Sequence, residues 1–325
     1  LAEETKRTIP TPQLLLKEQI DELTSQVEEL EKRIQKLTEG AWTFTFGPDF
    51  DPSALERKAG VKVHEKVRVA AKGWRLAFSS KGIPMVEPAF ANAERGSDSD
   101  EIHGLAFKVN RDELRLLDAV EASSNRVKVE LEAYDGRELE GFLYTAKPHL
   151  VDEAPPSARY LKAFLKAARE ADLSAEYVEK LVGTAVYKPT VAVLDARKKL
   201  PKMEDLEEIS CEELEDMADE DQFTHVSCLG YIVRVPKSKI FVGSHRGRDI
   251  TTRALKQWRG QPLEEADELG QPPYPSLAST TTEEMQYVKN WLDHYLWAGG
   301  SDAVVGFLSE FRRQREMEAM GLFKR

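Results

Sequence analysis

The sequence is poor in cysteine, and its apolar residues form no long uninterrupted run. Only two cysteines, Cys211 and Cys228, occur in 325 residues, and neither lies in a CxxC or similar spacing. This excludes a disulfide-rich framework and a cysteine-based zinc site. No apolar run approaches the roughly 18 residues that a membrane-spanning helix needs. We therefore expect no membrane span and a soluble chain in a reducing compartment, either the cytoplasm or, if a targeting segment was removed, an organelle matrix.

Other familiar signatures of chemistry are also missing. The six histidines lie far apart in the sequence and show no metal-ligand pairing. No Gly-rich nucleotide loop occurs, and no serine or cysteine lies in a nucleophile-elbow pattern. Residues 1–12 contain no charged segment followed by an apolar core, so no secretory signal is expected. The sequence thus predicts neither a metal nor a cofactor.

An excess of positive charge is absent, which argues against nucleic-acid binding as the main function. The formal net charge is −11, but residues 204–221 alone hold eleven acidic residues and no basic one. The rest of the chain is therefore neutral overall. An acidic run of this kind is typical of a solvated amphipathic helix. We expect the basic stretch 244–253 to be a solvated face that meets the acidic run or a protein partner, with an anion site as the alternative.

Residues 1–40 are predicted to form a coiled-coil helix. From Leu16 to Leu37 apolar residues alternate in steps of four and three, at positions 16, 20, 23, 27, 30, 34 and 37. β-Branched residues alternate with leucine along this seam, which favours two parallel strands. The pattern predicts a homodimer through residues 16–37. The alternative is one long helix lying on the body of its own chain, and Gly40 ends the helix in either case.

The rest of the chain reads as short strands followed by helices, which predicts a mixed α/β fold. Strands are expected at 42–46, 66–71, 74–79, 101–110, 127–132 and 140–146, with a turn at 80–84, a loop at 92–100 and helices at 53–59, 111–120, 157–171 and 174–181. After Gly183 the composition changes. The expected features there are an extended segment 184–202, a hairpin 231–242, a linker 261–279, and helices at 250–259, at 281–297 and from Ser301.

Several of these stretches, taken in order, resemble the gamma-glutamylcyclotransferase-like superfamily. They are FTFGPDF (44–50), GWRLAFSSKGIP (73–84), VEPAFANAE (86–94), EIHGLAFKV (101–109), LDAVEAS (117–123), GFLYTAKP (141–148) and PPSARYLKAFLKAAREADLSAEYVEKL (155–181). The resemblance implies that residues 41–183 form a small mixed β-barrel with flanking helices and a cavity at one end. Residues 184–325 would be a C-terminal α/β extension that the resemblance does not cover.

The resemblance also implies a reaction. Enzymes of this family convert γ-glutamyl amines into 5-oxoproline and a free amine, because the α-amine of the substrate attacks its own γ-carbonyl. No cofactor is needed when the nucleophile is already tethered. One glutamate in an L-D-x-x-E pattern serves as acid and base, and here that position is Glu121. A single carboxylate within hydrogen-bond reach is enough for both proton transfers.

The remaining expected site residues also come from the resemblance. The turn after the first strand, Phe46-Gly47-Pro48-Asp49, would hold the γ-glutamyl head, with Gly47 offering a backbone N–H to the developing oxyanion. Two tyrosines match family positions that line or brace the pocket, and one asparagine matches a loop segment near it. They are Tyr144, Tyr160 and Asn92. Core aromatics with satisfied hydroxyls and ordinary loop packing are the alternative readings of these three.

The turn departs from the family pattern, and this opens a second hypothesis. The family loop typically reads Tyr-Gly-Ser-Asn, whereas Phe46 lacks a hydroxyl, Pro48 lacks a backbone N–H and Asp49 carries a negative charge. The residue after the glutamate, a glycine in the family, is Ala122. The chain is therefore either a gamma-glutamylcyclotransferase or a catalytically inactive scaffold of the same fold that binds partners through its coiled coil and charged C-terminal region.

Overall fold

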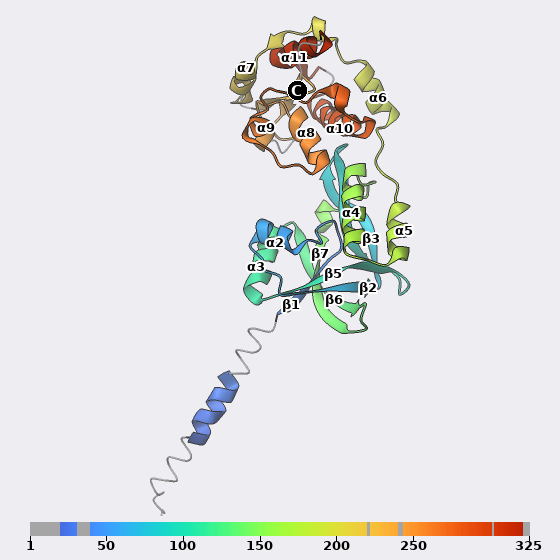
Figure 1. Cartoon of the computed structure of the whole chain (residues 1–325), viewed down its shortest axis with the longest axis vertical. Helices are drawn as coiled ribbons and strands as arrows, with labels where there is room; N and C mark the ends of the chain where they lie inside the picture. Colours follow the sequence, from blue (N-terminus) through green and yellow to red (C-terminus); the bar gives the residue numbers. More distant parts are fainter. Residues whose placement is uncertain (1–19, 31–39, 220–221, 240–242, 301, 321–325) are drawn as a thin grey trace, which may run out of the picture. The chain divides into compact units, whose positions relative to one another are not determined.

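The computed structural model describes residues 20–30, 40–219, 222–239, 243–300 and 302–320 (Figure 1). The chain divides into two compact units, each discontinuous in sequence. The first unit extends to residue 76 and also holds residues 93–147 and 167–177, and the second holds residues 77–92, 148–166 and 178–325. The predicted boundaries near residues 40 and 183 remain predictions.

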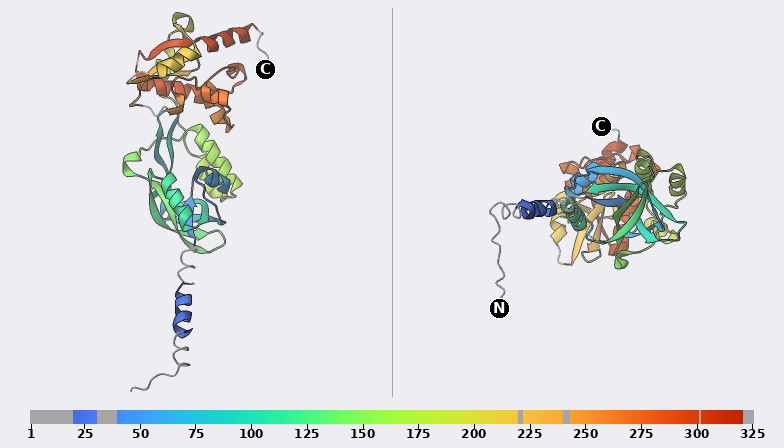
Figure 2. Two further views of the ribbon diagram at one scale, coloured as in Figure 1. Left: turned by 90° about the vertical axis from the view of Figure 1, so that its left-hand side faces the viewer. Right: turned by 90° about the horizontal axis from the view of Figure 1, so that it is seen from below.

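A closed five-stranded barrel forms the first unit (Figures 1 and 2). Its strands, in barrel order, are β1 (Ala41–Thr45), β5 (Glu101–Val109), β2 (Glu65–Lys72), β6 (Ser124–Ala133) and β7 (Glu138–Ala146). Neighbouring strands are antiparallel, except that β1 and β7, which close the barrel, are parallel. The expectation of a small mixed β-barrel is confirmed.

Two glycines let the barrel strands approach one another. A Cβ atom on Gly104 of β5 would lie 2.1 Å from the carbonyl oxygen of Thr45, and one on Gly141 of β7 would lie 2.9 Å from that of Trp42. Real Cβ atoms do not approach backbone oxygens so closely, so both positions require glycine in this register. The sequence thereby fixes where β1 lies between its two neighbours.

Two helices accompany the barrel in the first unit, α2 (Pro52–Ala59) and α3 (Arg111–Val120). Asp51 caps α2 through the backbone N–H of Ser53, and Gly60 ends it at φ 66°. Asn110 begins α3 with a full capping box to Glu113. α3 buries Leu114 and Leu117 beside β5, and burying each leucine stabilises the fold by about 2 kcal/mol.

A long hairpin, β3 (Trp74–Ile83) and β4 (Glu87–Arg95), forms a separate two-stranded sheet. The expected turn at 80–84 and loop at 92–100 are wrong, because the turn lies at residues 84–86 and β4 runs to Arg95. Polar residues in these two stretches led to the wrong prediction of a turn and a loop. Asn92 is buried and donates from Nδ2 to Ser79 Oγ at 3.1 Å, so these side chains satisfy each other inside the strands rather than facing water.

The second unit also holds most of α4 (Ala158–Glu170) and the end of α5 (Ala175–Val182). A buried carboxylate, Glu87, joins the hairpin to two helices of this unit. It accepts hydrogen bonds from Ser157 Oγ at 2.6 Å and from Tyr287 Oη at 3.2 Å, and it forms an ion pair with Arg159. A charge with 2% exposure needs such partners, so this cluster ties three distant segments together.

A four-stranded sheet forms the centre of the C-terminal part of the second unit. Its order is β8 (Glu208–Ile209), β11 (Val304–Leu308), β10 (Tyr231–Pro236) and β9 (Phe223–Cys228). Helices α8 (Thr251–Arg259) and α10 (Thr282–Gly299) share one apolar core with β9 and β10, while α7 (Cys211–Asp216) and α11 (Ser309–Ala319) share a second core with β11. The predicted C-terminal α/β extension is therefore present.

Several expectations for this region are wrong in detail. The segment 184–202 contains α6 (Val191–Lys198), and the acidic run is divided between β8, α7 and short turns instead of forming one helix. The first strand of the expected hairpin 231–242 is present as β10, and positions 240–242 lie outside the described residues. β10 forms its hairpin with β9, which turns at Leu229-Gly230 with positive φ at both residues. The linker contains α9 (Glu265–Leu269), and β11 precedes the last helix. Short 3-10 helices are η1 (Pro148–Leu150), η2 (Met203–Asp205), η3 (Met217–Asp219), η4 (Gly243–His245) and η5 (Leu277–Ser279).

Residues 20–30 form the described part of the predicted coiled coil, and they are helical. The four seam side chains in this stretch are each more than half exposed: Ile20, Leu23, Val27 and Leu30. The seam positions 16, 34 and 37 lie outside the described residues. The dimer therefore remains a prediction, and an apolar stripe without cover is what one chain of such a dimer presents.

Gly104→Ala is expected to destabilise the barrel, because the new methyl group would meet the Thr45 carbonyl oxygen and a backbone atom cannot rotate away. Overpacking of this kind costs about 1–3 kcal/mol. Urea unfolding followed by circular dichroism should show a lower midpoint. The matched variant Gly183→Ala, whose nearest new contact would be at 3.5 Å, should leave the midpoint unchanged. Equal midpoints for the two variants would contradict the β1–β5 register.

Candidate active site at one end of the barrel

Glu121 occupies the C-cap of α3, directly before the turn into β6. Its backbone N–H donates to the carbonyl oxygen of Leu117 at 2.8 Å, and its own carbonyl accepts from the N–H of Ser124 at 2.8 Å. The side chain is half-buried, and Ser124 Oγ donates to Oε2 at 3.3 Å. Backbone and side chain are therefore both held, while part of the carboxylate stays accessible.

A hydrogen-bonded network holds the last turn of α3 against the barrel. Tyr144 Oη on β7 donates to Asp118 Oδ1 at 2.9 Å, and Arg126 Nη1 on β6 donates to Asp118 Oδ2 at 2.6 Å. Burial, followed by the hydrogen bond to Asp118, raises the pKa of Tyr144 well above its usual value. The Tyr144 hydroxyl therefore stays protonated as a donor. It braces the helix that carries Glu121, because Asp118 lies one turn before Glu121 on the same helix.

The turn after β1 contains the other predicted site residues of the first unit. Phe46 is buried, with its ring centroid 5.6 Å from that of Phe44, whereas Gly47 and Pro48 are half-buried and Asp49 is exposed. The hydroxyl of Thr45 donates to the carbonyl oxygen of Asp49 at 3.4 Å and closes the turn. Phe46 thus belongs to the barrel core, and the segment that remains accessible is Gly47 to Asp49.

Strand direction brings this turn and Glu121 to the same end of the barrel. Because β1 and β7 are parallel, Thr45 and Ala146 end their strands at the same side. Ala146 pairs with Ser124, the residue whose hydroxyl contacts Glu121. The sequence separates Gly47 and Glu121 by more than seventy positions, and the parallel closure is what returns them to one end.

Asn92 and Tyr160 belong to the second unit, unlike the other candidates. Tyr160 is 8% exposed, and its hydroxyl accepts from the backbone N–H of Ala91 at 3.1 Å. Its ring packs edge-on against Phe90, with the centroids 5.1 Å apart. Within its own unit, Tyr160 is therefore a core aromatic residue with a bonded hydroxyl, and Asn92 is its buried strand neighbour.

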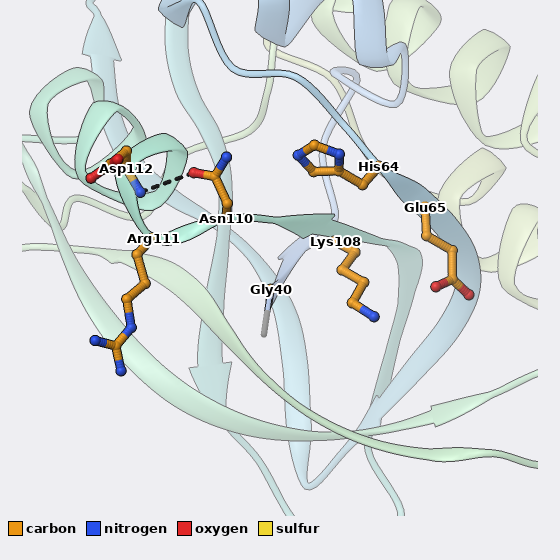
Figure 3. A pocket seen from close by; sticks show the side chains of 7 residues that line it. All are labelled: Gly40, His64, Glu65, Lys108, Asn110, Arg111 and Asp112. Atoms are coloured by element: carbon orange, nitrogen blue, oxygen red, sulfur yellow. Dashed lines mark hydrogen bonds between the residues drawn. The ribbon is translucent and has the colours of Figure 1, made fainter. Parts of the chain in front are cut away.

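A polar pocket of about 550 Å³ opens at the opposite end of β1, between Gly40 before the strand and Asn110 after β5 (Figure 3). Sequence reasoning did not find it. Its lining mixes basic and acidic side chains: Gly40, His64, Glu65, Lys108, Asn110, Arg111 and Asp112. His64 Nε2 lies 2.9 Å from Glu113, but that carboxylate also accepts from the backbone N–H of Asn110 at 2.6 Å. The pair thus fastens the start of α3, and Glu121 lies at the other end of the same helix.

Comparisons with known proteins cover this part of the chain. The AIG2-like family matches residues 101–181, a range that contains β5, α3 and Glu121. Gamma-glutamyl cyclotransferase aclK of Aspergillus oryzae is 25% identical over 162 residues, which are 43% of this chain and 59% of that protein. The central domain is gamma-glutamylcyclotransferase-like. The chain spans 59% of the length of this curated relative, so the match does not extend over either whole protein.

Solved structures also resemble the gamma-glutamylcyclotransferase-like domain. One is named gamma-glutamyl cyclotransferase, with a TM-score of 0.40 and 21% identity over 50% of this chain and 100% of that one. Another is a yeast gamma-glutamyl cyclotransferase specific to glutathione, with a TM-score of 0.31 and 12% identity over 44% of this chain and 94% of that one.

Three further properties concern the described part of the chain. Among these residues, no helix combines the length and the apolar character needed to cross a membrane. In the same residues, no group of three or more His, Cys, Asp or Glu side chains is arranged to hold a metal ion. Both cysteines are unpaired, with Cys211 half-buried and Cys228 buried.

Removing the hydroxyl of Tyr144 should loosen the last turn of α3. Tyr144→Phe leaves Asp118 with Arg126 as its donor and should cost about 1 kcal/mol of stability, since Asp118 is 40% exposed and water replaces part of the lost bond. A double-mutant cycle with Asp118→Ala, measured by urea unfolding, should give a coupling energy of similar size. Strictly additive effects would show that the hydrogen bond contributes nothing.

Proposed function

We propose that the chain converts γ-glutamyl amines into 5-oxoproline and a free amine, with Glu121 as the acid and base. The observation that carries this proposal is the setting of Glu121, held at the end of α3, half-buried, within the range that matches the AIG2-like family. A related protein that is itself named a gamma-glutamyl cyclotransferase supports the reaction class.

The proposed reaction needs only proton transfers around a ring closure. The Glu121 carboxylate takes a proton from the substrate α-ammonium, and the freed amine attacks the γ-carbonyl carbon to form the ring C–N bond. Glu121 passes this first proton to solvent and then takes the second proton, which the attack leaves on the ring nitrogen. The tetrahedral oxyanion collapses, the original amide C–N bond breaks, and the departing nitrogen takes this proton from Glu121. The free amine then gains a further proton from solvent. No oxidant or co-reactant is required, because the nucleophile and the electrophile belong to one molecule.

The turn from Phe46 to Asp49 is the proposed binding segment for the γ-glutamyl head, with the N–H of Gly47 as oxyanion donor. Pro48 has no N–H to add. Loss of one oxyanion donor typically costs on the order of 3 kcal/mol, or a hundredfold or more in rate. We therefore expect slow turnover. Tyr144, Tyr160 and Asn92 stay predictions as substrate-binding residues, and the engaged hydroxyl of Tyr144 favours a bracing role for that residue.

A catalytically inactive scaffold is the second candidate, and the same turn favours it. Phe46 contributes its ring to the core where the family has a tyrosine, and Asp49 adds a negative charge near an anionic substrate. The exposed apolar stripe of residues 20–30 offers a surface for assembly. For either candidate we place the chain in the cytoplasm or an organelle matrix, which fits two unpaired cysteines.

Glu121→Gln is expected to lower kcat/KM for 5-oxoproline formation at least a hundredfold, because the amide can neither accept nor return the proton. The purified chain would be given glutathione, γ-glutamyl-alanine and γ-glutamyl-lysine, and 5-oxoproline would be quantified by mass spectrometry. Glu130→Gln is the matched control, since that glutamate is exposed on β6 and should tolerate the change. The free energy of unfolding of both variants should lie within about 1 kcal/mol of the parent value.

The outcomes separate the two candidates. Product that disappears in Glu121→Gln and persists in Glu130→Gln supports the enzyme. Product that persists in both variants removes Glu121 from the mechanism. No product from any of the three donors, with a folded parent protein, rejects cyclotransferase activity toward them and supports the scaffold.

The proposed homodimer has its own test. Val27→Glu places a charge in the seam and should weaken dimerisation at least tenfold, because the carboxylate would be buried against its counterpart. Sedimentation equilibrium should show twice the chain mass for the parent and a shift toward the single mass for the variant. Ser25→Glu, off the seam, should behave as the parent. A parent protein that is monomeric at micromolar concentration would contradict the dimer.

A further inference from the structure

Lys147 follows β7 directly, and its side chain folds back onto the turn that carries Glu121. Its Nζ donates to the carbonyl oxygen of Ala122 at 2.6 Å, and its backbone N–H donates to the carbonyl oxygen of Ser123 at 3.3 Å. Both acceptors lie in the turn between α3 and β6, directly after Glu121. The Lys147 ammonium is therefore held beside the residue that follows the candidate acid and base.

The strand directions place this lysine at the end of the barrel that holds the other candidate residues of the first unit. Lys147 is the residue after Ala146, which ends β7 on the same side as Thr45 ends β1. The turn that contains Gly47 begins directly after Thr45. Lys147, this turn and Glu121 thus come from three separate segments that belong to one end of the barrel.

The positive charge of Lys147 has no acidic partner in the part of the chain that the structure describes. The residue is half-buried, and its ammonium carries three N–H groups, of which the Ala122 carbonyl oxygen takes one. Arg126, another cation at the last turn of α3, differs because it pairs with Asp118 at 2.6 Å. Lys147 therefore keeps a full charge and two donors for a ligand.

The proposed substrate needs such a cation. A γ-glutamyl head carries a carboxylate on the carbon atom that also bears the attacking amine. Glu121 and Asp49 are both acidic, so this end of the barrel would repel that carboxylate if no positive charge compensated them. A lysine ammonium is a compact charge with rotatable donors, which suits a single carboxylate. Lys147 is placed to provide it without taking part in the proton transfers.

We propose that Lys147 binds the α-carboxylate of the γ-glutamyl head and thereby selects γ-glutamyl donors over amides that lack this group. This role rests on the proposed function, because the carboxylate belongs to the same substrate. Glu121 still carries both proton transfers. The alternative is a purely structural role, in which the bond from Lys147 Nζ to Ala122 only closes the turn.

The test uses the full chain and two probes that differ only in the α-carboxylate: γ-glutamyl-alaninamide and 4-aminobutyryl-alaninamide. Binding is measured by isothermal titration calorimetry in the Glu121→Gln variant, which is expected to bind the probes without converting them. The γ-glutamyl probe should bind about tenfold more tightly than the 4-aminobutyryl probe, because only the first makes a charge-assisted hydrogen bond to Lys147. Adding Lys147→Met should remove this preference.

Further variants separate carboxylate binding from a structural role. Lys147→Gln can still donate to Ala122 but has no charge, so it should also lose the preference, whereas Lys147→Arg should keep it. Lys128→Met, which removes an exposed lysine from β6, is the matched control and should leave the binding of both probes unchanged. With Glu121 intact, Lys147→Met should raise KM for the γ-glutamyl probe about tenfold and change kcat less than about threefold. Urea unfolding should show that each variant is folded.

The outcomes separate the carboxylate site from the reaction. The role of Lys147 is overturned if the preference persists in Lys147→Met and Lys147→Gln, if these variants weaken both probes equally, or if neither probe binds Glu121→Gln. If the parent forms no 5-oxoproline but a preference that depends on Lys147 is present, the proposed reaction is wrong and the carboxylate site stands. Such a preference together with loss of 5-oxoproline formation in Glu121→Gln supports both.

Discussion

The barrel unit depends on a short parallel pairing, in which Trp42 and Thr43 of β1 meet Gly141 and Phe142 of β7. This pairing closes the ring, and it turns two remote chain segments toward the same end of the barrel. A side chain on Gly141 would press against the Trp42 carbonyl oxygen, so a single hydrogen atom at that position permits the closure. If β1 were antiparallel to β7, Gly47 and Glu121 would lie at opposite ends and no common site would exist.

Helix α3 holds Glu121, the candidate acid and base, at a fixed place on the closed barrel. Its first turn is fastened by Asn110 and Glu113, and Glu113 is 7% exposed with His64 as an additional partner. Its last turn is held by Tyr144 and Arg126 through Asp118. Both ends of a ten-residue helix are thus fixed to the barrel by hydrogen bonds, and its middle is fixed by buried leucines. Such support on a rigid element is what a proton-transferring side chain needs to keep its geometry.

The second unit buries a charged residue, Glu87, next to the tip of the β3–β4 hairpin. Glu87 would be costly to bury alone, and its partners come from the segment before α4, from α4 itself and from α10. The hairpin tip, α4 and the C-terminal helices therefore share one polar cluster next to an apolar core that includes Val86. The C-terminal extension thus forms a unit with parts of the central sequence instead of a separate appendage.

The sequence by itself determined the local structure and the class of fold. The sequence predicted helices at 111–120, 250–259 and 281–297, and the structure forms α3, α8 and α10 over nearly the same residues. These features depend on residues close together in the chain, so their chemistry can be read directly. The order of seven short stretches then identified the gamma-glutamylcyclotransferase-like domain, in which Glu121 is the predicted acid and base.

Only the tertiary structure decided which polar residues are buried and what lies beside them. Asn92 was expected in a loop, but in the structure it lies inside β4 and its side chain is bonded to Ser79 of β3. β11 replaced an expected helix because β8 and β10 flank it. The hydroxyl of Tyr144 donates to Asp118, and Arg197 on α6 donates to Asp293 on α10. Each of these results from a contact between distant residues, which no local pattern of side chains encodes.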